Sequence, residues 1–88
     1  MPMQMDPEDA RLVVTFLRSL RSWTQEELSA ASGVDRGLIS DYEQGDKLPR
    51  PKTLQRLTAA VGLPYSFVHT LLPVFRSARQ NGPIAGSA

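Results

Sequence analysis

The segment of residues 33–45, GVDRGLISDYEQG, carries side chains that could hydrogen-bond to the edges of nucleic-acid bases. A glycine lies at each end and an isoleucine in the middle, which favours a short exposed helix held on a glycine turn. Helices of this kind often enter the major groove of DNA. This segment is unusual for that purpose, because Arg36 is its only cation, Asp35 and Asp41 are acidic, and Gly37 has no side chain where the helix should begin.

The rest of the chain offers little other chemistry. There is no cysteine for a disulfide or a thiolate ligand, and His69 is the only histidine among 88 residues. No nucleophile, base and acid form a recognisable set, so we expect no catalytic site, no metal site and no cofactor. No apolar run approaches the roughly 20 residues that span a bilayer. The acidic start MPMQMDPEDA lacks the apolar stretch of a signal peptide, so we expect a soluble cytoplasmic protein without a membrane partner.

The charges are unevenly distributed along the chain. The net charge is +1, but residues 1–46 hold nine acids and four bases, whereas residues 47–88 hold six bases and no acid. A chain divided in this way can present one basic face while it stays near neutral overall. The alternative is that these charges only solvate the surface.

Three helices are expected in the first half of the chain. The first spans about residues 7–21, because Asp6 can cap it, proline and acids suit its first turn, and apolar residues recur at three- and four-residue spacing. The second begins after Thr24, which has the capping-box spacing to Glu27, and ends at the glycine turn. Asp35 can cap the third, which the last glycine of the quoted segment stops.

The second half is expected to hold two more helices. Pro51 fits the first turn of a fourth helix, which Gly62 ends. A fifth begins near Pro64, and Pro73 must end or kink it. Residues 74–80 could then add a short sixth helical turn.

No β-strand pattern or internal repeat appears, so the sequence predicts a compact all-α domain over residues 7–80. Residues 1–6 and the tail 81–88, which consists of helix breakers and small residues, are expected to be flexible.

The second and third helices are about three residues apart, so they must cross at a steep angle, as in a helix-turn-helix over residues 25–44. That crossing needs one small residue in the second helix, a glycine in the turn and apolar residues at four other places. All six requirements are met, by Leu28, Ser29, Gly33, Val34, Ile39 and Tyr42. The alternative is an ordinary αα-hairpin within a helical bundle.

The chain resembles the phage repressor and Cro family of helix-turn-helix proteins, also called the xenobiotic-response-element type. The resemblance lies in FLRSLRSWTQEELSAASGV and ISDYEQGDKLPRPKTLQRLTAAVGLP, and it covers about residues 12–72. It implies a five-helix, lambda-repressor-like DNA-binding fold. The chain departs from the family in three ways. Ser22 stands where glycine is usual, Ser29 replaces alanine, and Gly37 and Asp41 occupy positions where longer neutral or basic side chains are common.

The resemblance implies that the third helix is the recognition helix. Its base-reading positions are occupied here by Arg36, Gly37, Ser40 and Asp41. The fork of Arg36 can bind both acceptors of a guanine, and Asp41 can accept from the N4 amino group of cytosine. Gly37 reads nothing itself, but its missing side chain lets the helix end approach the DNA.

The resemblance also implies contacts to the DNA backbone, with two at the start of the second helix and four after the recognition helix. The residues at these positions are Thr24, Gln25, Gln44, Lys47, Arg50 and Lys52. Each loop cation could instead be merely solvated. Arg18 and Glu43 align with an ion pair that joins the first helix to the end of the third, so we assign them to structure.

Two functions are compatible with these features. The first is a sequence-specific regulator of double-stranded DNA, a repressor or autoregulator in the cytoplasm at a bacterial or phage nucleoid. It would act as a homodimer on a roughly palindromic site. The resemblance places the dimer contacts after the fourth helix, at Phe67, Leu71, Leu72, Val74 and Phe75. The second is a protein-binding module of the same fold, such as an antitoxin, with a protein partner and weak DNA contacts.

Overall fold

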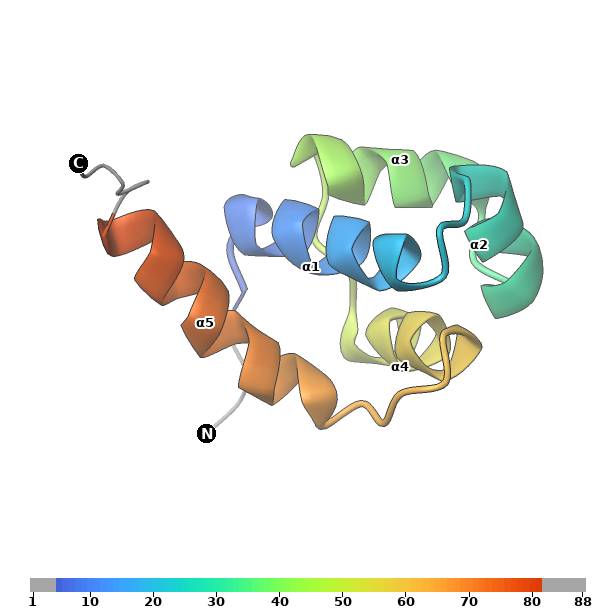
Figure 1. Ribbon diagram of the computed structural model, residues 1–88. Coiled ribbons are helices and arrows are strands. Elements are labelled where there is room, and N and C mark those ends of the chain that lie inside the picture. Colours follow the sequence, from blue (N-terminus) through green and yellow to red (C-terminus); the bar gives the residue numbers. More distant parts are fainter. Residues whose placement is uncertain (1–4, 82–88) are drawn as a thin grey trace.

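The computed structural model describes residues 5–81 of the chain. Its five helices are α1 (Pro7–Leu20), α2 (Gln25–Ser32), α3 (Arg36–Gln44), α4 (Pro51–Ala60) and α5 (Phe67–Asn81), and this range contains no strand. α1 packs against α3, α4 and α5, while α2 packs against α3 and α4. In Figure 1, α3 lies above α1, α2 lies at the C-terminal end of α1, α4 lies below α1, and α5 runs diagonally from below α1 to its left. The predicted all-α fold of five helices is confirmed.

Helix boundaries follow local capping chemistry. Asp6 and Thr24 each form a capping box with the residue three places on, so α1 and α2 begin directly after them. The carboxylate of Asp35 caps α3 by accepting from a backbone N–H in its first turn. Gly33 and Gly45 end α2 and α3 at φ angles of 77° and 78°, in the left-handed region that a residue with a side chain rarely adopts.

The connection from α1 to α2 contains a residue in an unfavourable backbone conformation. Ser22 has a φ of 55°, and no other non-glycine residue among those described has a positive φ. Glycine has no Cβ to clash in this conformation, which explains why a glycine would suit this position better.

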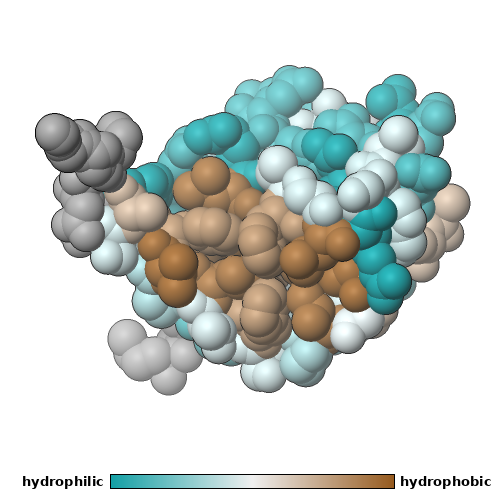
Figure 2. Space-filling model, in the orientation of Figure 1, coloured by the Kyte–Doolittle hydropathy of each residue, from teal (hydrophilic) through white to brown (hydrophobic). Residues whose placement is uncertain are grey.

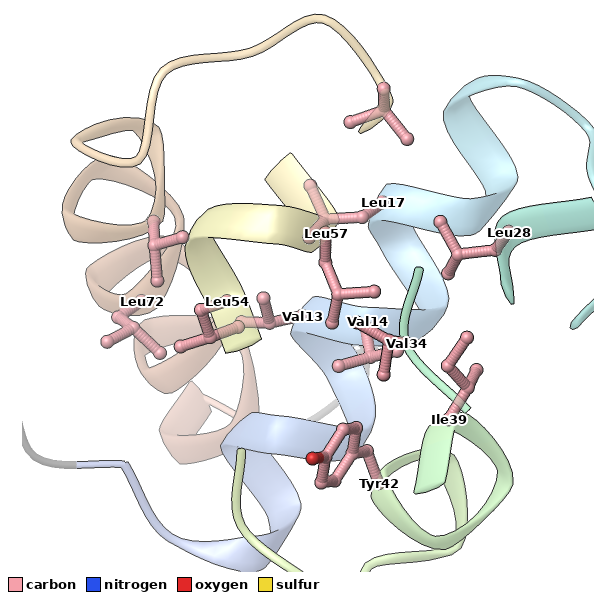
Figure 3. Close-up of a cluster of buried hydrophobic side chains, with 12 residues drawn as sticks. Val13, Val14, Leu17, Leu28, Val34, Ile39, Tyr42, Leu54, Leu57 and Leu72 are labelled. Carbon is pink, nitrogen blue, oxygen red and sulfur yellow. The ribbon is translucent and has the colours of Figure 1, made fainter. Parts of the chain in front are cut away.

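The hydrophobic core lies between the five helices. Each helix contributes apolar side chains to one cluster, shown in Figure 3. α1 provides the central strip, formed by Val13, Val14 and Leu17, all of which are fully buried. Tyr42 of α3, one of the apolar positions of the helix-turn-helix, is 4% exposed and lies in the core.

The sequence-based description of α5 was wrong in two respects. The helix begins at Phe67 rather than near Pro64, and it continues through Pro73 to Asn81, so residues 74–80 belong to α5 and form no sixth helix. Proline removes only one helical hydrogen bond, and contacts beyond it can offset that loss. Here Phe75 packs edge-on against Phe16 of α1, with ring centroids 5.7 Å apart.

An ion-pair cluster also holds the second half of α5. The carboxylate of Asp9 is fully buried and accepts hydrogen bonds of 2.8 Å from both Arg76 and Arg79. Arg79 lies 3.6 Å from Asp6 as well. These contacts join residues 67 to 73 positions apart, which the local sequence pattern cannot reveal.

Most of the two chain ends that were expected to be flexible lies outside the described residues, at 1–4 and 82–88. Within the described part, Asp6 caps α1 and Asn81 is the last residue of α5. None of the helices in residues 5–81 combines the length and apolar character needed to cross a membrane.

Candidate nucleic-acid interface

The α2–α3 unit is held by contacts within its own turn. Val34 is buried between the two helices, and its N–H donates to the Ser32 hydroxyl at 3.1 Å. The Ser29 hydroxyl donates to the carbonyl oxygen of Val34 at 2.6 Å. The serine that replaces a smaller alanine therefore closes the turn with an extra hydrogen bond. Together with the left-handed Gly33, these contacts fix the direction in which α3 leaves the turn.

The outer face of α3 carries the four residues predicted to face the bases. Arg36 and Gly37 are exposed, whereas Ser40 and Asp41 are half-buried. Arg36 makes no hydrogen bond or ion pair with any described residue, so its guanidinium is available to a ligand. The structure therefore brings these four residues together on one side of the helix, opposite the core residues Ile39 and Tyr42.

Two of these four residues have partners within the chain. The Ser40 hydroxyl accepts a hydrogen bond of 3.0 Å from the side-chain amide of Gln44. Asp41 forms an ion pair with Lys47, with 3.5 Å between Nζ and Oδ2. The sequence reasoning placed Asp41 and Lys47 in separate roles and missed this pair, because it depends on the path of the chain after α3.

Gly37 has a structural role that the sequence reasoning also missed. Its N–H donates to the Oδ2 atom of Asp35 at 2.9 Å, and this bond caps α3. A Cβ at position 37 would lie 2.9 Å from the same oxygen, closer than real Cβ contacts. Glycine therefore leaves room for the capping carboxylate.

The start of α2 is also occupied by contacts within the protein. The Thr24 hydroxyl accepts from the N–H of Glu27 at 3.1 Å, and the Glu27 carboxylate accepts from the N–H of Thr24 at 2.8 Å. The side-chain amide of Gln25 donates to the Glu43 carboxylate at 3.2 Å. The side chains of Thr24 and Gln25 are therefore already oriented by hydrogen bonds within the protein, and a phosphate at this helix end would contact them in these orientations.

The ion pair predicted between Arg18 and Glu43 is confirmed. Two N–H groups of Arg18 donate to the two carboxylate oxygens of Glu43 at 2.7 and 2.8 Å, in a bidentate geometry. A third donates to the carbonyl oxygen of Trp23 at 2.9 Å. The hydrogen bonds to Glu43 raise the pKa of Arg18 above its ordinary value. Because Glu43 also binds Gln25, this cluster fixes α3 to both α1 and the start of α2.

The cations predicted to bind phosphates lie beyond the C-terminal end of α3. Lys47, Arg50 and Lys52 are all exposed, in the loop and at the start of α4. Near them is an open hollow of about 440 Å³, lined by Leu38, Tyr42, Lys47, Leu48, Arg50 and Thr53. No group of three His, Cys, Asp or Glu side chains within residues 5–81 is arranged to hold a metal ion.

The residues predicted for dimer contacts divide into two groups. Leu71 and Leu72 are 7% and 4% exposed, so they are core residues of the single chain and cannot form an outer surface. They face inward because α5 packs this side against α1. Val74 is 59% exposed, and Phe67 and Phe75 are half-buried. Figure 2 shows a continuous apolar area on the face that contains α1 and α5.

Comparison with known proteins agrees with this arrangement. Residues 17–68 match the sequence profile of the helix-turn-helix family of the Cro/C1 type. The match spans more than half of the chain and includes the whole of the α2–α3 unit. This protein therefore belongs to the Cro/C1-type helix-turn-helix family.

Curated relatives share part of this sequence. An uncharacterized HTH-type transcriptional regulator of Mycobacterium bovis is 35% identical over 60 residues, which cover 68% of this chain and 23% of the relative. Uncharacterized HTH-type transcriptional regulators from two strains of Mycobacterium tuberculosis match with the same identity and coverage. The chain thus spans about a quarter of the length of these relatives. No solved structure matches it at a significant level.

Proposed function

We propose that this protein is a sequence-specific transcriptional regulator that binds double-stranded DNA through α3. The observation that carries the proposal is the outer face of α3, where the exposed guanidinium of Arg36, which has no partner within residues 5–81, lies beside Gly37. The relatives named as transcriptional regulators support the same function. A regulator of this kind acts in the cytoplasm, at the nucleoid of a bacterium or phage.

The residues on the outer face of α3 contact different base pairs. Arg36 binds the O6 and N7 atoms of a guanine, since its planar fork matches these two acceptors. Ser40 and Asp41 face the neighbouring base pairs, and Asp41 accepts from the N4 amino group of a cytosine. Gly37 allows the backbone of α3 to approach the DNA closely.

Contacts to phosphates supply most of the affinity for DNA, whereas contacts to base edges supply the preference for one sequence. Lys47, Arg50 and Lys52 bind phosphates on one side of α3. On the other side, Thr24 and Gln25 present the positive end of the α2 dipole. Gln44 adds a neutral hydrogen bond at the end of α3.

The protein acts as a homodimeric repressor or autoregulator. Two copies meet through the apolar face of α5, at Val74, Phe67 and Phe75 together with Phe16 of α1. Their recognition helices then occupy half-sites about one helical turn apart. Sedimentation analysis of the purified protein tests this arrangement, and Val74→Glu should shift a dimer to a monomer.

A protein-binding module, such as an antitoxin, is the second candidate. It is favoured by the carboxylates at the N-terminal ends of α2 and α3. Glu27 lies in the first turn of α2, and Asp35 is the N-cap of α3. These carboxylates repel phosphate from the helix ends. A stable stoichiometric complex with a protein, combined with no affinity for DNA, would favour this second function.

The decisive experiment is selection of bound sequences from a random pool of duplex DNA by the purified protein. We expect a roughly palindromic consensus with a guanine in each half-site. Arg36→Ala should weaken binding to that site by about 1–3 kcal/mol and remove the preference at one base pair. If the Arg36→Ala protein selects the same consensus as the parent, Arg36 does not read a base and the protein-binding function becomes the better one.

A further inference from the structure

The ion pair between Asp41 and Lys47 joins two residues that have opposite effects on DNA. Asp41 lies on the outer face of α3 and repels phosphate, whereas Lys47 attracts it. Their side chains are 36% and 58% exposed, so both remain accessible to solvent and to a ligand. In the free protein each side chain is the partner of the other.

The backbone after α3 builds this pair. Gly45 adopts the left-handed conformation, and the N–H groups of Gly45 and Asp46 both donate to the carbonyl oxygen of Asp41, the latter at 2.8 Å. The chain therefore turns back over the last turn of α3. Lys47 follows directly and arrives beside the Asp41 side chain, so the pair results from the helix-ending turn as well as from the reach of a long side chain.

We propose that Asp41 and Lys47 act together as a specificity determinant that exchanges partners only on the preferred DNA sequence. The proposal rests on the DNA-binding function proposed above. On the preferred site, Lys47 leaves the carboxylate for a phosphate, and the carboxylate gains the N4 amino group of a cytosine. On other sequences Asp41 finds no donor, and its carboxylate would face the polyanion unpaired if Lys47 left. The ion pair then persists and Lys47 makes no phosphate contact.

The strength of the pair suits such an exchange. Exposed ion pairs contribute little net stability, so the pair can open when both partners receive new ones. The pair is also loose, with 3.5 Å between Nζ and Oδ2, whereas charge-assisted hydrogen bonds to a phosphate or a base edge are about 2.7–2.9 Å long. Lys52 provides the contrast, because it is exposed and has no ion-pair partner within residues 5–81. It binds phosphate on any sequence.

The dependence of binding on salt measures this exchange directly, because each phosphate contact releases condensed counterions. The purified protein is titrated at several salt concentrations with two duplexes of equal length, one carrying the selected sequence and one scrambled. We expect the slope of log K against log salt to be steeper on the selected duplex by about one, owing to the additional contact from Lys47.

Two variants test the contributions of Asp41 and Lys47 to the salt dependence separately. Asp41→Asn frees Lys47 on all DNA, so the slope on the scrambled duplex should rise by about one and the difference between the duplexes should vanish. Lys47→Gln should lower the slope on the selected duplex by about one and leave the slope on the scrambled duplex unchanged. The matched control, Lys52→Gln, should lower both slopes equally. Thermal melting of each variant verifies that it is folded.

The outcomes distinguish this inference from the proposed function. Equal slopes on the two duplexes for the parent protein, unaltered by Asp41→Asn, would overturn the inference alone. A Lys47→Gln protein that loses the same slope on both duplexes would also overturn it, because Lys47 would then bind phosphate on any sequence. Absence of salt-dependent binding to either duplex would overturn the proposed function and this inference together.

Discussion

The two ends of α1 are held by ion pairs of opposite polarity. At its C-terminal end, Arg18 of α1 reaches outward to Glu43 of α3. At its N-terminal end, the buried Asp9 of α1 receives Arg76 and Arg79 of α5. In both places the charge on α1 complements the helix dipole, since acids suit the N-terminal turn and bases the C-terminal turn. α1 thus holds α3, the candidate recognition helix, at one end and α5, which carries the candidate dimer surface, at the other.

The Arg18–Glu43 pair and the Asp9 cluster differ in how much of the structure would be freed if each were removed. α3 packs against both α1 and α2 and is also anchored by Ile39 and Tyr42, so it cannot move without disturbing the core. The second half of α5 follows a proline, and among the other helices α5 packs mainly against α1, so this segment can detach alone. Removal of the Arg18 pair should therefore destabilise the whole domain, whereas removal of the Asp9 pairs should open one segment.

The largest expected effect is that of Arg18→Met. This change leaves the Glu43 carboxylate, whose side chain is 8% exposed, without its charged partner, so we expect a loss of about 3–5 kcal/mol in the free energy of unfolding. Adding Glu43→Leu removes the stranded charge and should recover much of the loss. Denaturant unfolding of the parent, both single variants and the double variant measures the coupling. Strictly additive effects would show that the two residues do not interact.

The double variant Arg76→Met/Arg79→Met should have a smaller effect, about 1–3 kcal/mol, because Asp9 can regain water when the end of α5 detaches. Hydrogen exchange should accelerate at the backbone amides of residues 74–79 and stay unchanged in α3. Arg56→Met, which removes an exposed arginine of α4, is the matched control and should alter neither quantity. Unchanged protection at residues 74–79 would mean that other contacts, such as that of Phe75, hold the segment.

The same contrast shows which features the sequence could predict. Capping depends on residues within one turn, so the starts of α1, α2 and α3 were found from Asp6, Thr24 and Asp35. The Arg18–Glu43 pair was found through the family resemblance, since residues 25 positions apart form no local pattern. The Asp9 cluster had no such guide. The proline in α5 pointed to a helix end or a kink, and the helix continues through it, held by long-range contacts.

The candidate site divides in a similar way. The outer face of α3 followed from helical spacing, and the structure places Arg36 and Asp41 on it. The partners of Asp41 and Gln25 did not follow, because they depend on the turn at Gly45 and on the orientation of Glu43. A residue's position on a helix is a property of the local sequence, whereas its partner is a property of the assembled fold.

Acid should weaken the N-terminal end of α1. The backbone hydrogen bond from Asp9 lowers the pKa of Asp6 below its usual value, with a further contribution from Arg79. A carboxyl group with a depressed pKa in the folded state stabilises the protein above its unfolded-state pKa, and this contribution is lost as the pH falls through the folded-state value. Asp6→Asn keeps a capping oxygen but does not titrate. Its unfolding free energy should therefore fall less steeply than that of the parent at acidic pH, and parallel curves would contradict this assignment.

The smallest effect is expected at the opposite end of α1, at Ser22. Its φ of 55° is unfavourable for a residue with a Cβ, so Ser22→Gly should relieve strain in the folded state. Glycine also gains freedom in the unfolded chain, and this opposes the benefit. We expect a net stabilisation of at most about 1 kcal/mol, measured by thermal unfolding. Ser22→Ala keeps the Cβ and removes the hydroxyl, so it should not stabilise the protein. If alanine and glycine stabilise it equally, the hydroxyl rather than the backbone conformation is the source of the cost, and this end of α1 carries no backbone strain.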